Sequence, residues 1–237
     1  MPIKVLIIIP CFNEEKSIAL LLEELLKINF SNKYRVEIVV VNDGSQDKTV
    51  EVVSQFNITI LDLPVNIGIG GAVQTGLKYA FENDFEIAIQ VDGDGQHPPM
   101  EILKMLKAQE ENPSNLIIGS RFISKEGFQS SLLRRLGIFY LHWLNKILTQ
   151  KKFYDITSGF RLFDKKAISL AARFYPDEYP EPESLVIFAK AGFSISETPV
   201  LMKPRQGGQS SIRYFSQVYY IIKVSLAMFF SYIRKVN

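Results

Sequence analysis

The sequence has one cysteine and two histidines among its 237 residues, so it is poor in the side chains that form cross-links or zinc sites. The single thiol, Cys11, excludes a disulfide framework and a zinc site built from several cysteines. Two histidines argue against a histidine-rich metal site. The net charge is also small: 27 lysines and arginines against 25 aspartates and glutamates leave +2, which gives no reason to expect nucleic-acid binding. The chemistry must therefore rest on carboxylates, arginines and backbone groups.

A long uncharged hydrophobic run is also missing. The apolar run at residues 5–10 is too short for a signal peptide and lacks a small-residue cleavage site, so we expect a cytoplasmic protein. Residues 214–234 are long enough to span a bilayer, but Lys223 stands in their middle among scattered polar residues. We predict an amphipathic helix lying on the inner face of the membrane. A helix packed on the domain and a true span are the alternatives.

The apolar residues of this C-terminal segment recur at steps of three or four, so they would form one stripe along a helix. Lys223, Arg234 and Lys235 could then extend to lipid headgroups. The stripe consists of Phe215, Val218, Tyr219, Ile222, Leu226, Phe229, Phe230 and Ile233. We therefore divide the chain into a globular domain over residues 1–211 and a membrane-associating helix over residues 212–237.

Strand and helix patterns alternate through the first half of the chain. Short apolar, β-branched runs indicate buried strands, and the segments between them have the helical spacing of apolar residues. The strands are expected at 4–9, 36–41, 58–63, 85–91 and 116–119, and the helices at 14–28, 47–55, 70–82 and 99–110. This order predicts an α/β fold, with a doubly wound, mostly parallel sheet and helices on both faces. In such sheets, ligands bind at the carboxyl ends of the strands.

The second half is less regular. Residues 131–149 form a basic, aromatic-rich amphipathic segment that is typical of a membrane surface, although its Arg134 and Arg135 could equally belong to a solvated helix face. We expect helices at 165–173 and 182–191, a strand at 159–163 and a pair of strands around Pro199 within 193–202. Loops rich in proline, and in glycine and serine, are expected at 175–182 and 206–211.

Acidic residues follow three of the predicted strands. Helix capping explains one acidic or polar residue per turn, as at Asp47, but not Asp92 and Asp94 together in a glycine-flanked turn. Two like charges so close are costly unless a cation compensates them. Hard oxygen ligands, with Gln96 as a third, suit Mg²⁺ or Mn²⁺ bridging a diphosphate. His97 either belongs to this site or is a turn residue before Pro98.

These motifs, in this order and spacing, resemble a family 2 glycosyltransferase of GT-A fold. The resemblance rests on residues 7–15 (IIIPCFNEE), 41–49 (VNDGSQDKT), 66–68 (NIG) and 90–98 (QVDGDGQHP). Further along, residues 119–122 (GSRF), the Arg134–Arg135 pair, residues 155–161 (DITSGFR) and residues 205–210 (RQGGQS) resemble the dolichyl- or polyprenyl-phosphate sugar transferase branch. The domain over 1–211 would then be a GT-A catalytic domain.

The resemblance implies roles for single residues. Nucleotide-sugar binding would fall to Pro10, Phe12, Asn13, Glu14, Asp43, Asp92, Arg205 and Ser210, and the metal site to Asp92, Asp94 and Gln96. Asp94, Arg121, Arg135 and Arg205 would be catalytic, the arginines by holding phosphates of the donor or the lipid acceptor. Ser210 would lie in a mobile loop closing over the donor.

The expected reaction is inverting, metal-dependent sugar transfer from a GDP- or UDP-linked donor to a polyprenyl or dolichyl phosphate. A phosphate acceptor is already an anion and needs cations rather than a general base, and planar arginines suit it. A sugar-hydroxyl acceptor would need a base such as Asp155 or Glu181. One departure from the branch is that Ile138 and Phe139 occupy the region where a serine is expected after the helix arginine.

Two rival functions remain open at this point. A cytoplasmic cell-wall or polysaccharide glycosyltransferase shares every donor-site residue and differs only after residue 120. Nucleotidyl transfer is the more remote alternative function, because nucleotidyltransferases have a glycine-rich loop with a basic residue where this chain has Pro10 to Asn13. The expected partners are a nucleoside-diphosphate sugar, polyprenyl phosphate, the membrane surface and, as an alternative anchor, a small integral membrane protein.

Overall fold

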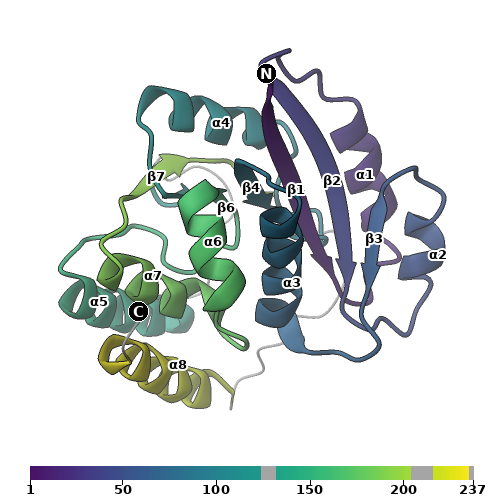
Figure 1. Cartoon of the computed structure of the whole chain (residues 1–237). Coiled ribbons are helices and arrows are strands. Elements are labelled where there is room, and N and C mark those ends of the chain that lie inside the picture. Colours follow the sequence, from purple (N-terminus) through teal and green to yellow (C-terminus); the bar gives the residue numbers. More distant parts are fainter. Residues whose placement is uncertain (124–131, 204–215, 235–237) are drawn as a thin grey trace.

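A seven-stranded sheet forms the centre of the molecule, in the order β3-β2-β1-β4-β6-β5-β7 (Figure 1). The computed structural model describes residues 1–123, 132–203 and 216–234. Its strands are β1 (Ile3–Cys11), β2 (Tyr34–Asn42), β3 (Thr59–Asp62), β4 (Ile87–Gln90), β5 (Leu116–Ser120), β6 (Arg161–Asp164) and β7 (Ile195–Pro199). Its helices are α1 (Ile18–Leu26), α2 (Thr49–Val53), α3 (Gly68–Glu82), α4 (Glu101–Glu111), α5 (Leu132–Thr149), α6 (Lys165–Arg173), α7 (Pro180–Lys190) and α8 (Ser216–Ile233).

Both faces of the sheet are buried, which explains why its strands read as continuous apolar runs. In β1, the side chains of Val5, Ile7 and Ile9 join the core beneath α1, α2 and α4. Those of Leu6 and Ile8 join the opposite core, beneath α3 and α6. All five are fully buried. The expected α/β fold, with a mostly parallel sheet and helices on both faces, is confirmed.

Strand β6 runs antiparallel to its neighbours β4 and β5, whereas the other paired strands are parallel. Arg161, the first residue of β6, pairs with Gln90 and Ile118 near the carboxyl ends of β4 and β5. The chain therefore enters β6 at the edge of the sheet where ligands bind. As a result, residues 155–161 lie beside the turn after β4.

Helices α5, α7 and α8 pack against one another and lie together away from β1, β2 and β3 (Figure 1). Val224 and Met228 of α8 are fully buried in the core that also contains Leu141 of α5 and Leu185 of α7. The opposite side of α8 is exposed. The C-terminal helix is thus both docked on the domain and apolar on its outer surface.

Most predicted elements are present, with shifted ends. Residues 193–202 contain one strand, β7, instead of the expected pair, because β7 already has its partner in β5. The predicted loop at 175–182 ends earlier, since Pro180 begins α7. Proline is tolerated there because the first turn of a helix has no intrahelical partner for its N–H groups.

Candidate active site

A cavity of about 710 Å³ opens at the carboxyl ends of β1, β2 and β4. Its wall is completed by residues around the start of α3, namely Asn66, Gly68, Ile69 and Ala72, and by Glu178 and Glu181 near the start of α7. The cavity brings together seven of the predicted site residues: Pro10, Phe12, Asn13, Glu14, Asp43, Asp92 and Asp94. They come from three separate loops, as expected for a sheet whose parallel strands end at one edge.

The loops after β1 and β2 hold each other through side chain to backbone hydrogen bonds. The N–H of Asn13 donates to Ser45 Oγ over 2.9 Å, and the N–H of Gln46 donates to Asn13 Oδ1 over 2.8 Å. The N–H of Glu15 donates to Asp47 Oδ2 over 3.1 Å, while Asp47 Oδ1 accepts the N–H of Thr49. Asp47, explained above as a cap, therefore joins with Asn13 and Ser45 in fastening one loop to the other, and Asn13 and Glu14 of the first loop line the cavity.

Asp43 holds the start of α3 beside the cavity. Its two carboxylate oxygens accept the N–H groups of Ile67 and Gly68 over 2.7 and 3.0 Å. The next residue, Gly44, has a φ of +66°, and a Cβ there would lie 2.8 Å from the backbone nitrogen of Asn66. A side chain at this position would push α3 away from Asp43, so the close approach requires glycine.

The two aspartates of the turn after β4 differ in their surroundings. The side chain of Asp92 is 33% exposed and accepts a hydrogen bond from Gln90 Nε2 over 3.3 Å. Asp94 is 4% exposed, and its Oδ1 accepts the N–H of Gln96 over 3.0 Å. The amide nitrogen of Gln96 lies 3.5 Å from the carbonyl oxygen of Lys203. Gln96 is therefore beside the acidic pair but outside the cavity lining.

The two carboxylates fit a metal that is bound together with its substrate. Within residues 1–123, 132–203 and 216–234, no cluster of three or more histidine, cysteine, aspartate or glutamate side chains is placed to hold an ion. Mg²⁺ is commonly held by one or two carboxylates together with substrate phosphates and water, so two carboxylates are sufficient. Gly159 leaves room for one of them, because a Cβ there would lie 3.0 Å from Asp92 Oδ2.

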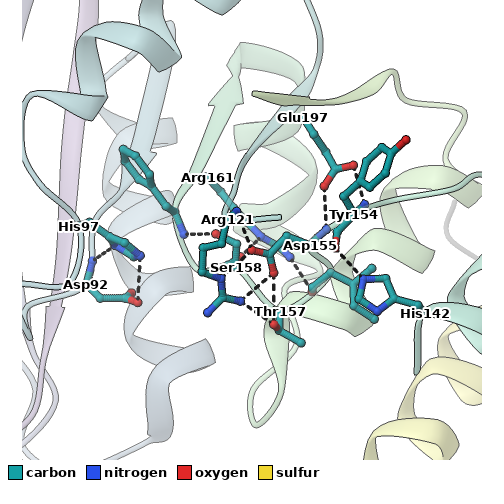
Figure 2. Close-up of polar contacts among 12 residues, drawn as sticks. Asp92, His97, Arg121, His142, Tyr154, Asp155, Thr157, Ser158, Arg161 and Glu197 are labelled. Carbon is teal, nitrogen blue, oxygen red and sulfur yellow. Dashed lines mark hydrogen bonds and ion pairs between the residues drawn. The ribbon is translucent and has the colours of Figure 1, made fainter. Parts of the chain in front are cut away.

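Arg121 directly follows β5 and lies outside the lining of the cavity, where Asp155 holds its side chain (Figure 2). Its Nε donates to Asp155 Oδ2 over 2.6 Å and its Nη2 donates to Asp155 Oδ1 over 2.7 Å. Nη2 also donates to Thr157 Oγ1 over 2.8 Å. Because Asp155 is fully buried in this pair, it is a poor candidate for the general base that the sequence left open.

Glu181 is the better candidate for a base. It lines the cavity, and burial raises the pKa of its carboxyl above the usual value, while the positive charge of Arg161 opposes this rise. Arg161 is itself fully buried and donates to Ser184 Oγ and to the carbonyl oxygens of Ser158 and Glu181. It therefore ties the start of α7 to residues 156–161.

Three predicted site residues cannot be placed. Arg205 and Ser210 lie outside the described residues, as does the side chain of Arg135, whose backbone belongs to the first turn of α5. Sequence reasoning did not recognise the role of Glu197 in this site. It is separated by 42 residues from Asp155, whose N–H it accepts, so no local spacing indicates the contact.

Comparison with known proteins identifies the family. The model of "Glycosyl transferase family 2" matches residues 6–170. The UDP-N-acetylglucosamine–dolichyl-phosphate N-acetylglucosaminyltransferase of Methanococcus voltae is 29% identical over 214 residues, which cover 82% of this chain and 83% of that protein. A dolichyl-phosphate β-glucosyltransferase of Trichomonas vaginalis is 30% identical over 223 residues, which cover 87% and 68%.

Solved structures agree on the fold. Glucosyl-3-phosphoglycerate synthase from Mycobacterium tuberculosis, in complex with Mn²⁺, uridine diphosphate and phosphoglyceric acid, superposes with a TM-score of 0.71 at 16% identity. The match covers 99% of this chain and 80% of that one, so the fold is GT-A. With the family model spanning residues 6–170, the chain belongs to glycosyl transferase family 2, and its relatives support the dolichyl-phosphate sugar transferase branch of that family.

Proposed function

We propose that this glycosyltransferase moves a sugar from a nucleoside-diphosphate donor to a polyprenyl phosphate at a membrane surface. The observation that carries the proposal is the cavity at the carboxyl ends of β1, β2 and β4, which joins a nucleotide-sized space to the acidic pair Asp92 and Asp94. The names of the relatives that act on dolichyl phosphate support the acceptor.

The donor would lie with its nucleoside against Pro10, Phe12 and Asn13 and its diphosphate towards Asp92 and Asp94. Those two carboxylates, with Gln96 beside them, would hold Mg²⁺ or Mn²⁺, which would neutralise charge on the leaving diphosphate. Arg121 would add a further positive charge that stabilises a phosphate group. Attack from the face opposite the leaving group would invert the anomeric centre.

A phosphate acceptor suits the second half of the site. An ionised phosphate oxygen needs no proton removed, and Arg121 is a cation close enough to Asp92 and Glu181, both in the cavity lining, to feel their charges. Arg135 and Arg205 are proposed as further phosphate contacts. Charge-assisted hydrogen bonds of this kind are worth about 1.5–3 kcal/mol each.

The outer surface of α5 and α8 supports a place at the membrane. Phe139 and Trp143 of α5 are 72% and 55% exposed. Six of the predicted stripe residues of α8 are exposed as well: Tyr219, Ile222, Leu226, Phe229, Phe230 and Ile233. A surface this apolar and this continuous marks an interaction site. Among the described helices, none has the length and apolar content needed to cross a bilayer.

One detail of that helix differs from expectation. Lys223 does not extend to the outer surface but forms an ion pair with Glu178 and lies over the rings of Tyr179 and Tyr219. The helix is therefore fastened to the segment that lines the donor cavity. We keep the division into a catalytic domain over 1–211 and a membrane-associating helix over 212–237 as a proposal about function, with peripheral attachment at the inner, cytoplasmic face.

The second candidate is transfer to a sugar hydroxyl. It is favoured by Glu181, whose carboxyl lines the cavity with a raised pKa, as a general base requires. The two candidates share the donor site and differ in what accepts the sugar.

Assays of the purified full chain can decide between them. The protein would be incubated with UDP- or GDP-linked sugars, Mg²⁺ or Mn²⁺, and polyprenyl phosphate in liposomes, and the lipid fraction would be analysed for a glycosyl phosphate. Formation of that product, abolished by chelator, is the expected result. Transfer only to added oligosaccharide would instead favour the second candidate.

A further inference from the structure

Arg121 has one guanidinium nitrogen left for a ligand. Its Nε and Nη2 donate to Asp155, and Nη2 donates to Thr157 as well. Even its backbone N–H donates to Asp155 Oδ2, over 3.1 Å. Within the described part of the chain, Nη1 has no hydrogen-bond acceptor, and Figure 2 shows no contact drawn to it. The side chain is 22% exposed, and Nη1 is not one of the buried unpaired nitrogens and oxygens of the described residues, so a ligand can reach it.

The partner of Arg121 is itself held by a second carboxylate. Glu197, on β7, accepts the N–H of Tyr154 through Oε2 over 2.7 Å and the N–H of Asp155 through Oε1 over 2.8 Å (Figure 2). His142 of α5 contacts the carbonyl oxygen of Tyr154 over 2.9 Å. The segment that carries Asp155 is thus fixed from β7 on one side and from α5 on the other.

Stability alone does not account for this arrangement. Asp155 already neutralises Arg121, and a second acid beside it adds repulsion and desolvation cost. Burial raises the pKa of Glu197 above its usual value; the hydrogen bonds from the N–H groups of Tyr154 and Asp155 oppose this rise, and the charge of Asp155 adds to it. A free arginine side chain loses about 2 kcal/mol of rotamer entropy when it is ordered, and here that loss is complete before any substrate binds. Donors fixed in advance are the ones that stabilise developing charge most effectively.

We propose that Asp155 and Glu197 are positioning residues, which hold Arg121 so that Nη1 is presented to a phosphate oxygen of the substrate. The inference rests on the proposed function, in which Arg121 binds phosphate. The oxygen belongs either to the leaving diphosphate of the donor or to the phosphate acceptor. Both have the same chemistry, and the experiment separates them.

The test is a double-mutant cycle in the full chain with Glu197→Gln and Arg121→Ala. Glutamine has one acceptor oxygen, so it leaves one of the two N–H groups without its partner. We expect Glu197→Gln to lower kcat/KM for transfer about tenfold, by analogy with the losses seen when groups that orient metal ligands are removed. In the Arg121→Ala background the same change should cause no further loss, because its effect passes through Arg121.

A matched control is Glu101→Gln. Glu101 is a buried acid that, like Glu197, accepts a backbone N–H, that of Leu201 over 3.1 Å, but none of its described contacts involves Arg121. Its effect on activity should be small and additive with Arg121→Ala. If Glu197→Gln does not fold, Thr157→Val serves instead, since it removes the hydroxyl that joins Nη2 to Asp155.

The measurements also separate the two phosphates. If Nη1 contacts the donor, Glu197→Gln weakens binding of the nucleoside diphosphate and slows donor hydrolysis without acceptor. If it contacts the acceptor, only KM for polyprenyl phosphate and transfer change. The inference is overturned if the losses of the two single variants add up in the double variant. It is also overturned if Glu197→Gln is fully active while Arg121→Ala is impaired. Either result leaves the proposed function intact. Full activity of Arg121→Ala overturns both the phosphate role of Arg121 and the inference.

Discussion

His97 accepts the backbone N–H of Asp92 through Nδ1, over 3.1 Å. Since Nδ1 is the acceptor, the proton of the neutral ring is on Nε2, which lies 3.8 Å from Asp92 Oδ2. Nε2 is buried and has no hydrogen-bond partner among the described residues. The ring stacks on Phe160, with 5.0 Å between centroids. Asp92 is therefore held at its backbone and approached at its carboxylate by the same side chain.

The first prediction concerns the protonation of His97. Burial lowers the pKa of this histidine, although the nearby Asp92 opposes the effect, so in the folded protein the ring takes up its proton only at a lower pH than an ordinary histidine does. The unfolded chain takes up the proton near 6.5, the usual histidine value. The free energy of unfolding should therefore fall as the pH drops below about 6.5, and His97→Asn should remove this part of the fall. Urea unfolding in chelator from pH 5.5 to 7.5 measures it.

A control separates titration from packing. Phe160→Leu disturbs the same stack without removing the imidazole, so it should keep the wild-type dependence on pH. Equal slopes for wild type and His97→Asn would show that His97 is not held neutral.

The sheet could be predicted because its signal is local. Apolar runs such as residues 5–9 and the helical spacing between them reveal parallel strands buried on both faces. The direction of β6 could not be predicted in this way. The four residues of β6, Arg161–Asp164, do not indicate in which direction the strand runs. That direction depends on where the chain re-enters the sheet after α5.

That Asp43, Asp92 and Asp94 share one cavity was predictable for the same reason, since strand ends of a parallel sheet meet at one edge. The second half depends on contacts between distant segments. Arg121 and Asp155 are 34 residues apart, and Tyr154 and Glu197 are 43 apart. Residue types alone made Asp155 look like a free acid, and the structure shows it paired.

The second prediction concerns the metal. Asp94 is buried rather than on an open surface turn, so Asp94→Asn, which keeps its shape, is a better test than alanine. We expect the variant to lose nearly all transfer and to lose stabilisation by Mn²⁺ with a nucleoside diphosphate in thermal unfolding. Asp84→Asn is a control, since the side chain of Asp84 is 81% exposed and outside the cavity lining, and it should keep transfer near wild type. Unchanged turnover of Asp94→Asn in excess chelator would contradict the metal role.

The third prediction uses Glu181→Gln to identify the acceptor. Transfer to polyprenyl phosphate should continue within about threefold of wild type, because no base is needed. Transfer to a sugar hydroxyl would fall by about 10²–10⁴ if Glu181 were its base. Burial raises the pKa of Glu181, so the folded protein keeps this proton at pH values above about 4.5 where the unfolded chain has lost it, and wild type loses stability there as the pH rises. The glutamine variant has no such proton and should therefore gain stability relative to wild type as the pH rises above about 4.5.

The fourth prediction concerns the arginines whose side chains the structure does not describe. Arg135→Ala and Arg205→Ala should each lower kcat/KM for lipid-phosphate transfer. The decrease should correspond to a loss of about 1.5–3 kcal/mol of transition-state stabilisation per arginine. Binding of the donor should suffer less in Arg135→Ala. Lys152→Ala, a nearby loss of charge after α5, is the control for general electrostatics. Equal activity of wild type and both variants would contradict the assignment.

The last prediction concerns the membrane. Deleting residues after 211 would release α8, but it would also remove Val224 and Met228 from the core and so confuse anchoring with folding. Substitution on the outer surface avoids this. Phe229 and Phe230 are both about half exposed, and a fully buried apolar side chain contributes about 1.5–3 kcal/mol. Phe229→Ser with Phe230→Ser should therefore reduce partitioning to anionic liposomes at least tenfold, while hydrolysis of the donor in solution and the unfolding temperature stay near wild type.

Leu20→Ser with Leu26→Ser, two exposed residues of α1 on the other face of the sheet, should leave partitioning unchanged. If the phenylalanine variant sediments with liposomes as well as wild type does, α8 is not the anchor. If both pairs reduce sedimentation equally, the attachment is not confined to the surface of α5 and α8.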